Sequence, residues 1–207
     1  MERKLRMGMV GGGIGSFIGP VHRIAASIDN KIELVSGAFS STKDKSLLSG
    51  KNLFLDQDRI YGNFQEMFKK EKDLSSDSRI DFVSIVTPNN SHYEIIMEAL
   101  DSGFHVVCDK PITINSKQAI EVEKKVIETK KLFCLTHNYT GYPMVKEAKD
   151  ILSGNHLGNI RKVVVEYPQG WLATRIEEDT PVWRTNPQIS GISSCMGDIG
   201  THCENLV

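Results

Sequence analysis

The feature that most constrains the fold of this chain is a glycine-rich bend directly after its first apolar segment. That segment ends at Val10, glycines occupy positions 11–13, 15 and 19, and a helical pattern of apolar residues begins at Pro20. Glycine has no Cβ, so the backbone can turn tightly and approach a phosphate closely. The N–H groups at the start of a following helix attract the negative charge of that phosphate. A strand, a glycine turn and a helix in this order predict a nucleotide-binding α/β domain.

The spacing of these glycines departs from the G-x-G-x-x-G pattern at its third position, where Ser16 stands. We assign the third glycine to Gly19, because Pro20 behind it suits the start of a helix. The loop is then longer than usual. A strand-to-helix turn without a ligand is the alternative that this motif alone leaves open. The loop residues that we expect at the cofactor are Gly11, Gly13, Ile14, Gly15 and Gly19.

The composition excludes several classes of function. A net charge of -1 predicts neither a nucleic-acid partner nor an anionic membrane surface. No apolar run reaches the ~18 residues that a membrane span needs. The N-terminus leads straight into the first strand, so we expect no signal peptide. The four cysteines lack disulfide or metal spacing, which predicts reduced thiols and a cytoplasmic protein.

Strand and helix patterns alternate up to about residue 138, which predicts a doubly wound parallel sheet. A short strand before Phe64 would add one more strand to the sheet. The other strand candidates are 4–10, 32–39, 81–86, 105–108 and 132–136.

Ligands of such sheets bind outside the carboxyl ends of the strands. Three loops fall there, at Gly11 to Gly19, Thr87 to His92 and Asp109 to Pro111. The second strand ends in Ser40 and Ser41, where an acidic residue usually holds the ribose of NAD. Their hydroxyls and the nearby lysines permit a 2′-phosphate, so NAD and NADP both stay open. A plain helix cap is an equally good interpretation of the two serines.

The pattern changes after Asn138. One helix closes at Gly154, one strand is expected at 161–167, and Asp198 and His202 are four residues apart. In a helix that spacing places both side chains on one face. One strand and two helices cannot close a two-layer domain. We therefore predict a dinucleotide-binding domain at 1–138 and the start of an incomplete α+β domain at 139–207, in a chain that is part of a longer protein.

Five features in this order resemble the Gfo/Idh/MocA family of NAD(P)-dependent oxidoreductases. They are the glycine bend, Thr87-Pro88-Asn89 with His92, Lys110-Pro111, Thr136-His137-Asn138-Tyr139, and Gly197-Asp198 with His202. The resemblance implies a Rossmann domain followed by a domain with an open antiparallel sheet. It also implies a set of cofactor-binding residues beyond the glycine loop, namely Ser40, Ser41, Thr87, Pro88, Asn89, His92, Asp109, Lys110 and Asn138.

The family's Glu-Lys-Pro motif reads Asp-Lys-Pro here. The carboxylate of Asp109 is one methylene shorter, which leaves its hydrogen-bond partner open. The same resemblance places Tyr139, Tyr142, Trp183 and Arg184 near the nicotinamide or the substrate. By their position in the first predicted helix, His22 and Arg23 are expected only to cover the sheet.

The expected reaction is hydride transfer between the cofactor and a hydroxyl or keto carbon of a sugar, a cyclitol or a related polyol. The resemblance makes His202 the proton-transfer residue, and an imidazole has a suitable pKa for that task. The ammonium of Lys110 would stabilise the developing alkoxide. Asp198 would orient His202 or accept a hydrogen bond from the substrate. The alternative is a catalytically silent NAD(P)-binding sensor or assembly protein.

We expect no metal, since Asp198, His202, Cys203 and Glu204 have no second cluster of ligands beside them. The full-length protein is expected to form a homo-oligomer.

Overall fold

The computed structural model describes residues 3–174 and 182–207. They form two compact units, the first ending at Leu135 and the second starting at Thr136. The predicted domain boundary after Asn138 lies close to this division and stays a prediction.

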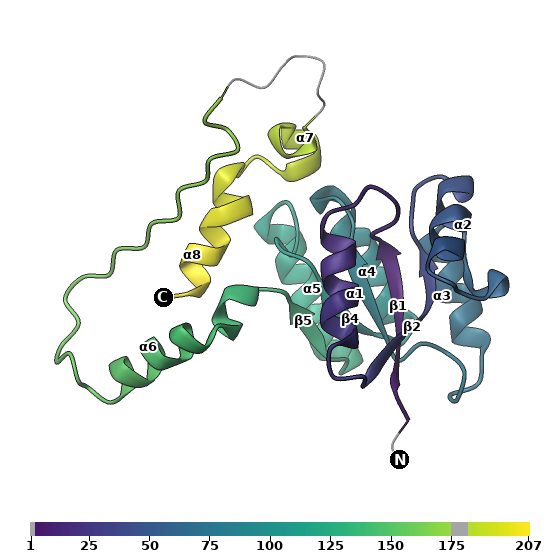
Figure 1. Ribbon diagram of the computed structural model, residues 1–207, viewed down its shortest axis with the longest axis horizontal. Coiled ribbons are helices and arrows are strands. Elements are labelled where there is room, and N and C mark those ends of the chain that lie inside the picture. The colour runs from purple at the N-terminus through teal and green to yellow at the C-terminus, as the bar shows by residue number, and fades with distance from the viewer. Residues whose placement is uncertain (1–2, 175–181) are drawn as a thin grey trace. The chain divides into compact units, whose positions relative to one another are not determined.

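A five-stranded parallel sheet with the order β2-β1-β3-β4-β5 forms the centre of the first unit (Figure 1). The chain runs from β1 to one side to form β2 and then to the other side to form β3, so the strand order reverses between β1 and β3. Such a switch point is where open α/β sheets bind their ligands. The prediction of a doubly wound parallel sheet is confirmed. The strands are β1 (Leu5–Gly11), β2 (Ile32–Ala38), β3 (Phe82–Val86), β4 (His105–Cys108) and β5 (Phe133–Leu135).

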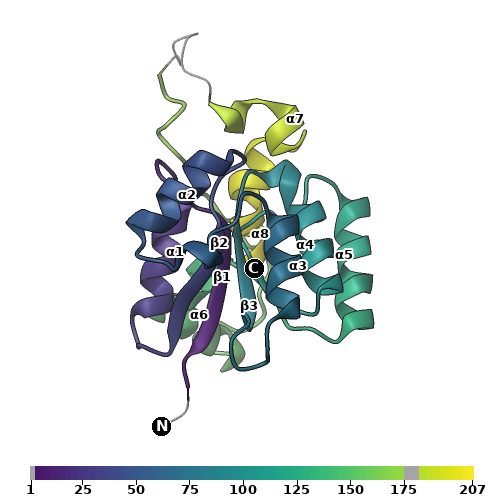
Figure 2. The ribbon, with the colours of Figure 1, turned by 90° about the vertical axis from the view of Figure 1, so that its right-hand side faces the viewer.

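Helices lie on both sides of this sheet (Figure 2). Two of them begin at asparagine caps, because the side chains of Asn63 and Asn115 accept hydrogen bonds from backbone N–H groups in the first turn. One side carries α3 (Phe64–Asp73), α4 (His92–Asp101) and α5 (Ser116–Thr129), and the other carries α1 (Ile18–Ser27) and α2 (Lys43–Asn52).

The structure differs from the sequence prediction at the start of one helix and at one expected strand. Helix α1 begins at Ile18 rather than Pro20, because Phe17 already has helical backbone angles. The short strand expected before Phe64 is absent from the described residues. A single parallel bridge between Gly37 and Ile60 stands in its place.

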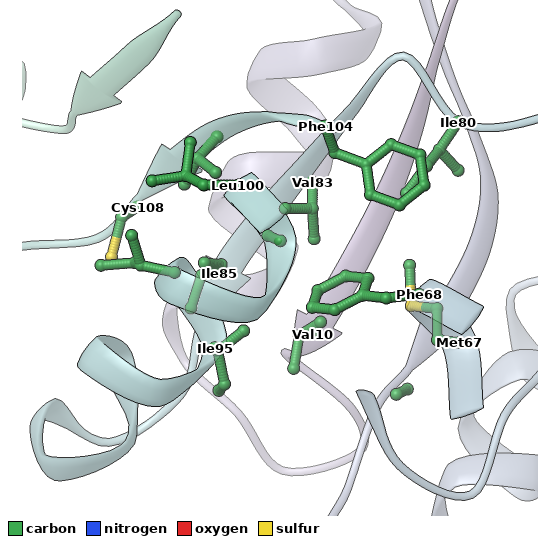
Figure 3. Close-up of a cluster of buried hydrophobic side chains, with 14 of the residues drawn as sticks. Val10, Met67, Phe68, Ile80, Val83, Ile85, Ile95, Leu100, Phe104 and Cys108 are labelled. Atoms are coloured by element: carbon green, nitrogen blue, oxygen red, sulfur yellow. The ribbon is translucent and has the colours of Figure 1, made fainter. Parts of the chain in front are cut away.

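Each side of the sheet has its own hydrophobic cluster. Successive side chains of a strand point to opposite faces, so Met9 joins the cluster beside α1 while Val10 joins the larger cluster under α3, α4 and α5. Figure 3 shows this larger cluster, which includes Val83 and Ile85 of β3 together with Phe68 and Phe104. The burial of these side chains holds the strand ends, and therefore the loops after them, in place.

The second unit is mainly helical within its described residues. Helix α6 (Pro143–Ser153) ends at Gly154, as predicted. It is followed by α7 (Pro187–Ser190), a π-helical turn (Met196–Gly200) and α8 (Thr201–Asn205).

The strand predicted at 161–167 is wrong for this structure. These residues are irregular, and Val163 and Val164 are exposed. A strand needs a neighbour to accept its backbone hydrogen bonds, and the described part of the second unit contains no other strand. Among the described residues of the whole chain, we find no helix with the length and apolar character needed to cross a membrane.

Candidate active site

The glycine loop after β1 has the backbone shape that only glycine adopts readily. Gly11, Gly12 and Gly15 have φ values of +82°, +73° and +83°. A Cβ on Gly13 would lie 2.6 Å from Ser49 Oγ and 2.7 Å from the carbonyl oxygen of Phe39, so this position excludes any side chain. Glycine at position 13 is therefore required by the close packing of the loop against Phe39 and Ser49.

Gly19 packs the first turn of α1 against this loop. A Cβ at Gly19 would lie 2.4 Å from Gly12 Cα and 2.6 Å from the Gly12 carbonyl oxygen. The same carbonyl oxygen accepts a 2.7 Å hydrogen bond from Arg23 Nη1. Burial lowers the pKa of Arg23 from its usual value. This packing agrees with the placement of Gly19 as the third glycine.

The N-terminus of α1 is open to an anion. Its N-cap residue Phe17 makes no side-chain cap, and the first turn contains no acidic residue. The N–H groups of the first turn and the positive end of the helix dipole favour a phosphate. Together with the glycine loop that precedes it, this end fits the pyrophosphate of a dinucleotide.

The end of β2 is followed by Ser40 and Ser41, the two serines that left the choice between NAD and NADP open. Ser40 Oγ accepts a 3.3 Å hydrogen bond from the backbone N–H of Thr42, while Ser41 is exposed. The N-cap of α2 is Thr42, which makes no side-chain cap. The capping interpretation therefore does not describe Ser41, and no acidic side chain occupies 38–42.

His92 lies at the end of the loop after β3 and is fully buried. Its Nδ1 is 2.8 Å from the carbonyl oxygen of Pro111, and its Nε2 is 2.9 Å from the carbonyl oxygen of Thr87. Burial lowers the pKa of His92 despite these two carbonyls, so the ring is neutral at pH 7 and donates to one carbonyl at a time. His92 thus links two of the three loops at the strand ends.

The other residues of the Thr87 loop are also held in place. Ser91 Oγ donates a 2.7 Å hydrogen bond to Thr87 Oγ1. The side chain of Asn89 is buried, at the start of a 3-10 turn that follows Pro88.

The Asp109-Lys110-Pro111 turn follows β4. The N–H of Asp109 donates a 2.9 Å hydrogen bond to the carbonyl oxygen of Ile85 in β3, and the Lys110–Pro111 peptide bond is cis. His22 of α1 lies 3.8 Å from Asp109, measured from Nε2 to Oδ1. Sequence reasoning missed this contact of His22. The signal that could have found it is Ser84, a polar residue inside an apolar strand, whose Oγ lies 2.9 Å from His22 Nδ1.

The second unit gathers aromatic and imidazole rings around His202, which is 4% exposed. The ring centroid of Tyr139 is 4.5 Å from that of His202, and the ring of His137 meets it edge-on at 5.7 Å. His137 Nε2 is 2.9 Å from Thr201 Oγ1. The 2.5 Å hydrogen bond to the hydroxyl of Tyr167, followed by burial, raises the pKa of Tyr139 to about 12. The hydroxyl of Tyr139 is therefore neutral at pH 7.

Asp198 lies in the π-helical turn before α8, so both members of the predicted pair are helical. Arg184 Nε is 3.7 Å from Asp198 Oδ2, and the guanidinium of Arg184 lies 4.5 Å from the ring centroid of Trp183. Tyr142 stacks on Tyr139, with 5.8 Å between the ring centroids. A cavity of about 330 Å³ lies beside this group, and its lining includes Tyr167, Trp171, Arg184 and Asp198.

The predicted site residues therefore fall into two sets, one in each unit. The first holds the glycine loop, Thr87 to His92 and Asp109 to Pro111. The second holds Asn138, Tyr139, Tyr142, Trp183, Arg184, Asp198 and His202. His137 and Tyr167 were missed, although His137 stands inside the Thr-His-Asn-Tyr segment. Within the two described ranges, no three His, Cys, Asp or Glu side chains are grouped to hold a metal ion.

A parallel sheet whose switch point carries a glycine loop and an uncapped helix N-terminus defines a dinucleotide-binding protein of the Rossmann class. Residues 5–137 match the family model described as an oxidoreductase family with an NAD-binding Rossmann fold. The chain belongs to this family, Gfo/Idh/MocA.

Named relatives and solved structures agree with this assignment. The chain is 36% identical over 206 residues to the uncharacterized oxidoreductase YfiI of Bacillus subtilis, covering 98% of this chain and 52% of that protein. It is 28% identical to levoglucosan dehydrogenase of Pseudarthrobacter phenanthrenivorans, covering 97% of this chain and 49% of the enzyme. An inositol dehydrogenase homolog from Azotobacter vinelandii, solved with NAD+, matches with a TM-score of 0.93 and 32% identity, over 99% of this chain and 52% of that one. The chain thus spans about half the length of the relatives it matches.

Proposed function

We propose that the protein containing this chain is an NAD(P)-dependent dehydrogenase that acts on a hydroxyl-bearing carbon of a sugar, a cyclitol or a related polyol. The observation that carries the proposal is the glycine loop after β1, at the switch point of the sheet. The loop of Thr87 and the turn of Lys110 follow β3 and β4, the next strands in the sheet order. The substrate class is supported by the relatives, which include levoglucosan dehydrogenase and an inositol dehydrogenase homolog solved with NADH and myo-inositol. The predicted homo-oligomer stays a prediction.

The cofactor would be held mainly by backbone. The glycine loop and the start of α1 would bind the pyrophosphate, and Thr87, Pro88 and Asn89 would border the ribose and nicotinamide. When bound, NAD supplies the acceptor for a hydride from the substrate carbon. The serines at the end of β2 leave NADP as the other possibility. Both ring nitrogens of His92 face backbone carbonyls. His92 would therefore support cofactor binding by holding the two loops that it links in place.

The chain's own side chains would move the proton. His202 would take it from the substrate hydroxyl, and the packing of Tyr139 and His137 around its ring would fix the orientation of the imidazole. Lys110 would stabilise the developing alkoxide with its positive charge. Asp198 would bind a second hydroxyl, with Arg184 holding its carboxylate in place. Tyr142 and Trp183 would line the sugar side.

The test is Lys110→Ala in the full-length protein. Cofactor affinity, followed by NADH fluorescence, should change by no more than about 3-fold, because backbone supplies most of the binding. Turnover of a panel of inositols and sugars should fall by roughly 10²–10³-fold, the effect of removing one group that stabilises transition-state charge.

The matched control is Lys124→Ala, which removes an exposed lysine of α5 and should leave both measurements unchanged. Unchanged turnover in Lys110→Ala contradicts the assignment of that residue. Binding of NADH without turnover of any polyol by the wild-type protein favours the silent sensor or assembly protein.

A further inference from the structure

A chain of polar contacts crosses the first unit from β3 to the turn that carries Lys110. Ser84, in the centre of β3, is 1% exposed. Its Oγ lies 2.9 Å from His22 Nδ1, on α1. The other ring nitrogen, Nε2, lies 3.8 Å from Asp109 Oδ1. Three elements that are distant in sequence are thus joined through one imidazole ring.

The two nitrogens of this ring have different tasks. A buried hydroxyl costs free energy unless it has a hydrogen-bond partner, and Nδ1 supplies that partner to Ser84. The 3.8 Å between Nε2 and the carboxylate exceeds a direct hydrogen bond. At that distance the ring N–H and the carboxylate attract each other electrostatically. The charges of Asp109 and Lys110 both act on the ring of His92, and the charge of Asp109 also acts on the buried thiol of Cys108.

We propose that His22 is a positioning residue, which holds the carboxylate of Asp109 and thereby orients the Asp109-Lys110-Pro111 turn. The turn is then fixed at both ends, by His22 at Asp109 and by His92 at the carbonyl of Pro111. A carboxylate one methylene shorter than glutamate reaches less far, and the imidazole of His22 spans the remaining distance toward β3. This inference rests on the proposed function only in giving the oriented lysine a catalytic task.

A matched pair of variants separates the two contacts of the ring. The side-chain amide of His22→Asn can take the place of Nδ1 and keep Ser84 satisfied, but it does not extend to Asp109. The longer amide of His22→Gln can take the place of Nε2 and reach the carboxylate. If His22 serves only as the hydrogen-bond partner of Ser84, asparagine should preserve the wild-type properties better than glutamine. If His22 positions Asp109, glutamine should preserve them better.

The readout is amide hydrogen exchange at Asp109, whose N–H donates to Ile85 across the strand ends. We expect exchange there to be at least ~10-fold faster in His22→Asn and near wild type in His22→Gln, as for a local opening. The amide of Val106, which donates to Leu132 within the sheet, should be unchanged in both variants. Val21→Ala, on the exposed side of α1, is the control and should alter neither amide.

Equal exchange at Asp109 in the asparagine and glutamine variants, or faster exchange in glutamine, overturns the proposal. In the full-length protein, turnover with NAD+ and myo-inositol should follow the same order, with kcat lowered and NADH affinity kept. Turnover insensitive to Lys110→Ala, with the exchange pattern as expected, would remove the proposed function and leave the positioning contact standing. If turnover falls as expected in Lys110→Ala but exchange at Asp109 is unchanged in both His22 variants, the positioning role of His22 is wrong and the proposed function stands.

Discussion

Single residues shape this site mainly by what they exclude or hold. Gly19 keeps a side chain out of the space between the loop and α1, and Gly13 does the same between the loop and Phe39 and Ser49. The polar side chain of His92 holds backbone carbonyls of two loops. None of these residues needs to touch the reacting atoms. Their effect on function passes through the position of the backbone.

The clearest prediction at this scale is Gly19→Ala. Its Cβ would lie 2.4 Å from Gly12 Cα, so either the loop or the helix must shift. We expect a loss of about 1–3 kcal/mol in the free energy of unfolding, which is typical of overpacking. NADH should bind at least ~10-fold more weakly, the equivalent of about 1.4 kcal/mol. Urea unfolding and a fluorescence titration measure the two effects.

Gly141→Ala is the control for this substitution, because a Cβ at Gly141 meets no atom within 4 Å and its φ is not positive. It should leave NADH affinity at the wild-type value. Wild-type affinity in Gly19→Ala would show that the loop does not need this close packing.

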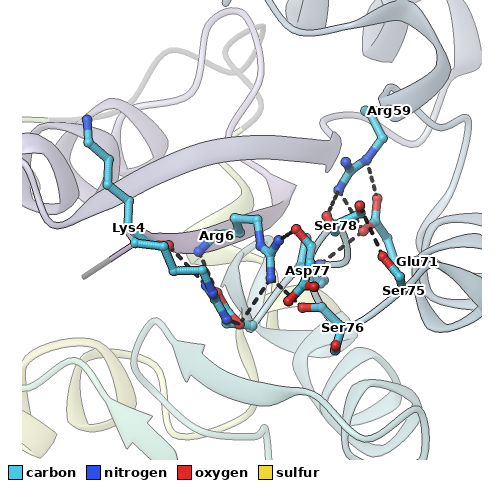
Figure 4. Close-up of polar contacts among 11 residues, drawn as sticks. Lys4, Arg6, Arg59, Glu71, Ser75, Ser76, Asp77 and Ser78 are labelled. Atoms are coloured by element: carbon cyan, nitrogen blue, oxygen red, sulfur yellow. Dashed lines mark hydrogen bonds and ion pairs between the residues drawn. The ribbon is translucent and has the colours of Figure 1, made fainter. Parts of the chain in front are cut away.

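At the scale of elements, one buried carboxylate ties α3 to the chain that enters β3. Glu71 is fully buried, and its two oxygens accept hydrogen bonds of 2.8 Å each from Arg59 (Figure 4). It also accepts from the hydroxyl of Tyr61 at 3.1 Å and from the N–H of Ile80 at 3.2 Å. Burial, together with the nearby charge of Glu71, raises the pKa of Tyr61, so that hydroxyl stays a donor. Glu71 therefore ties α3 to Arg59, Tyr61 and the backbone just before β3.

We predict that Glu71→Ala lowers the free energy of unfolding by about 3–5 kcal/mol, because it leaves Arg59 without its buried counter-charge. Glu66→Ala, which breaks an exposed pair with Lys70 on the same helix, should cost about 0.5 kcal/mol or less. Urea denaturation of the two variants at pH 7 compares the costs directly. Similar losses in both would mean that the buried cluster contributes no more than a surface pair.

For the whole molecule, the division into two units separates the three loops at the strand ends from the predicted site residues around His202. The first unit contains both hydrophobic clusters and all three loops at the strand ends. The second contributes the rings around His202 and leaves much of its apolar surface exposed, including Val163 and Val164. Folding of the first unit should therefore not depend on the second.

We accordingly expect residues 1–135 alone to unfold in one cooperative transition, as small single domains usually do. The fragment should bind NADH within about 5-fold of the full chain, a difference of about 1 kcal/mol. Circular dichroism during urea unfolding and a fluorescence titration test both statements. A fragment that folds without binding NADH would show that residues after 135, such as Asn138, supply most of the cofactor affinity.

The sequence by itself determined the sheet and the loops at its strand ends. Glycines after an apolar segment, apolar strands and polar strand ends are local signals, and they placed β1 to β5, Gly19 and the Thr87 and Asp109 loops without any knowledge of neighbours. Only the tertiary structure decided that His22 meets Asp109, that Glu71 meets Arg59, and that 161–167 is not a strand. Each of these depends on which distant segments become neighbours. Burial and pairing arise from the whole packed chain, and the spacing of residues along the sequence does not specify them.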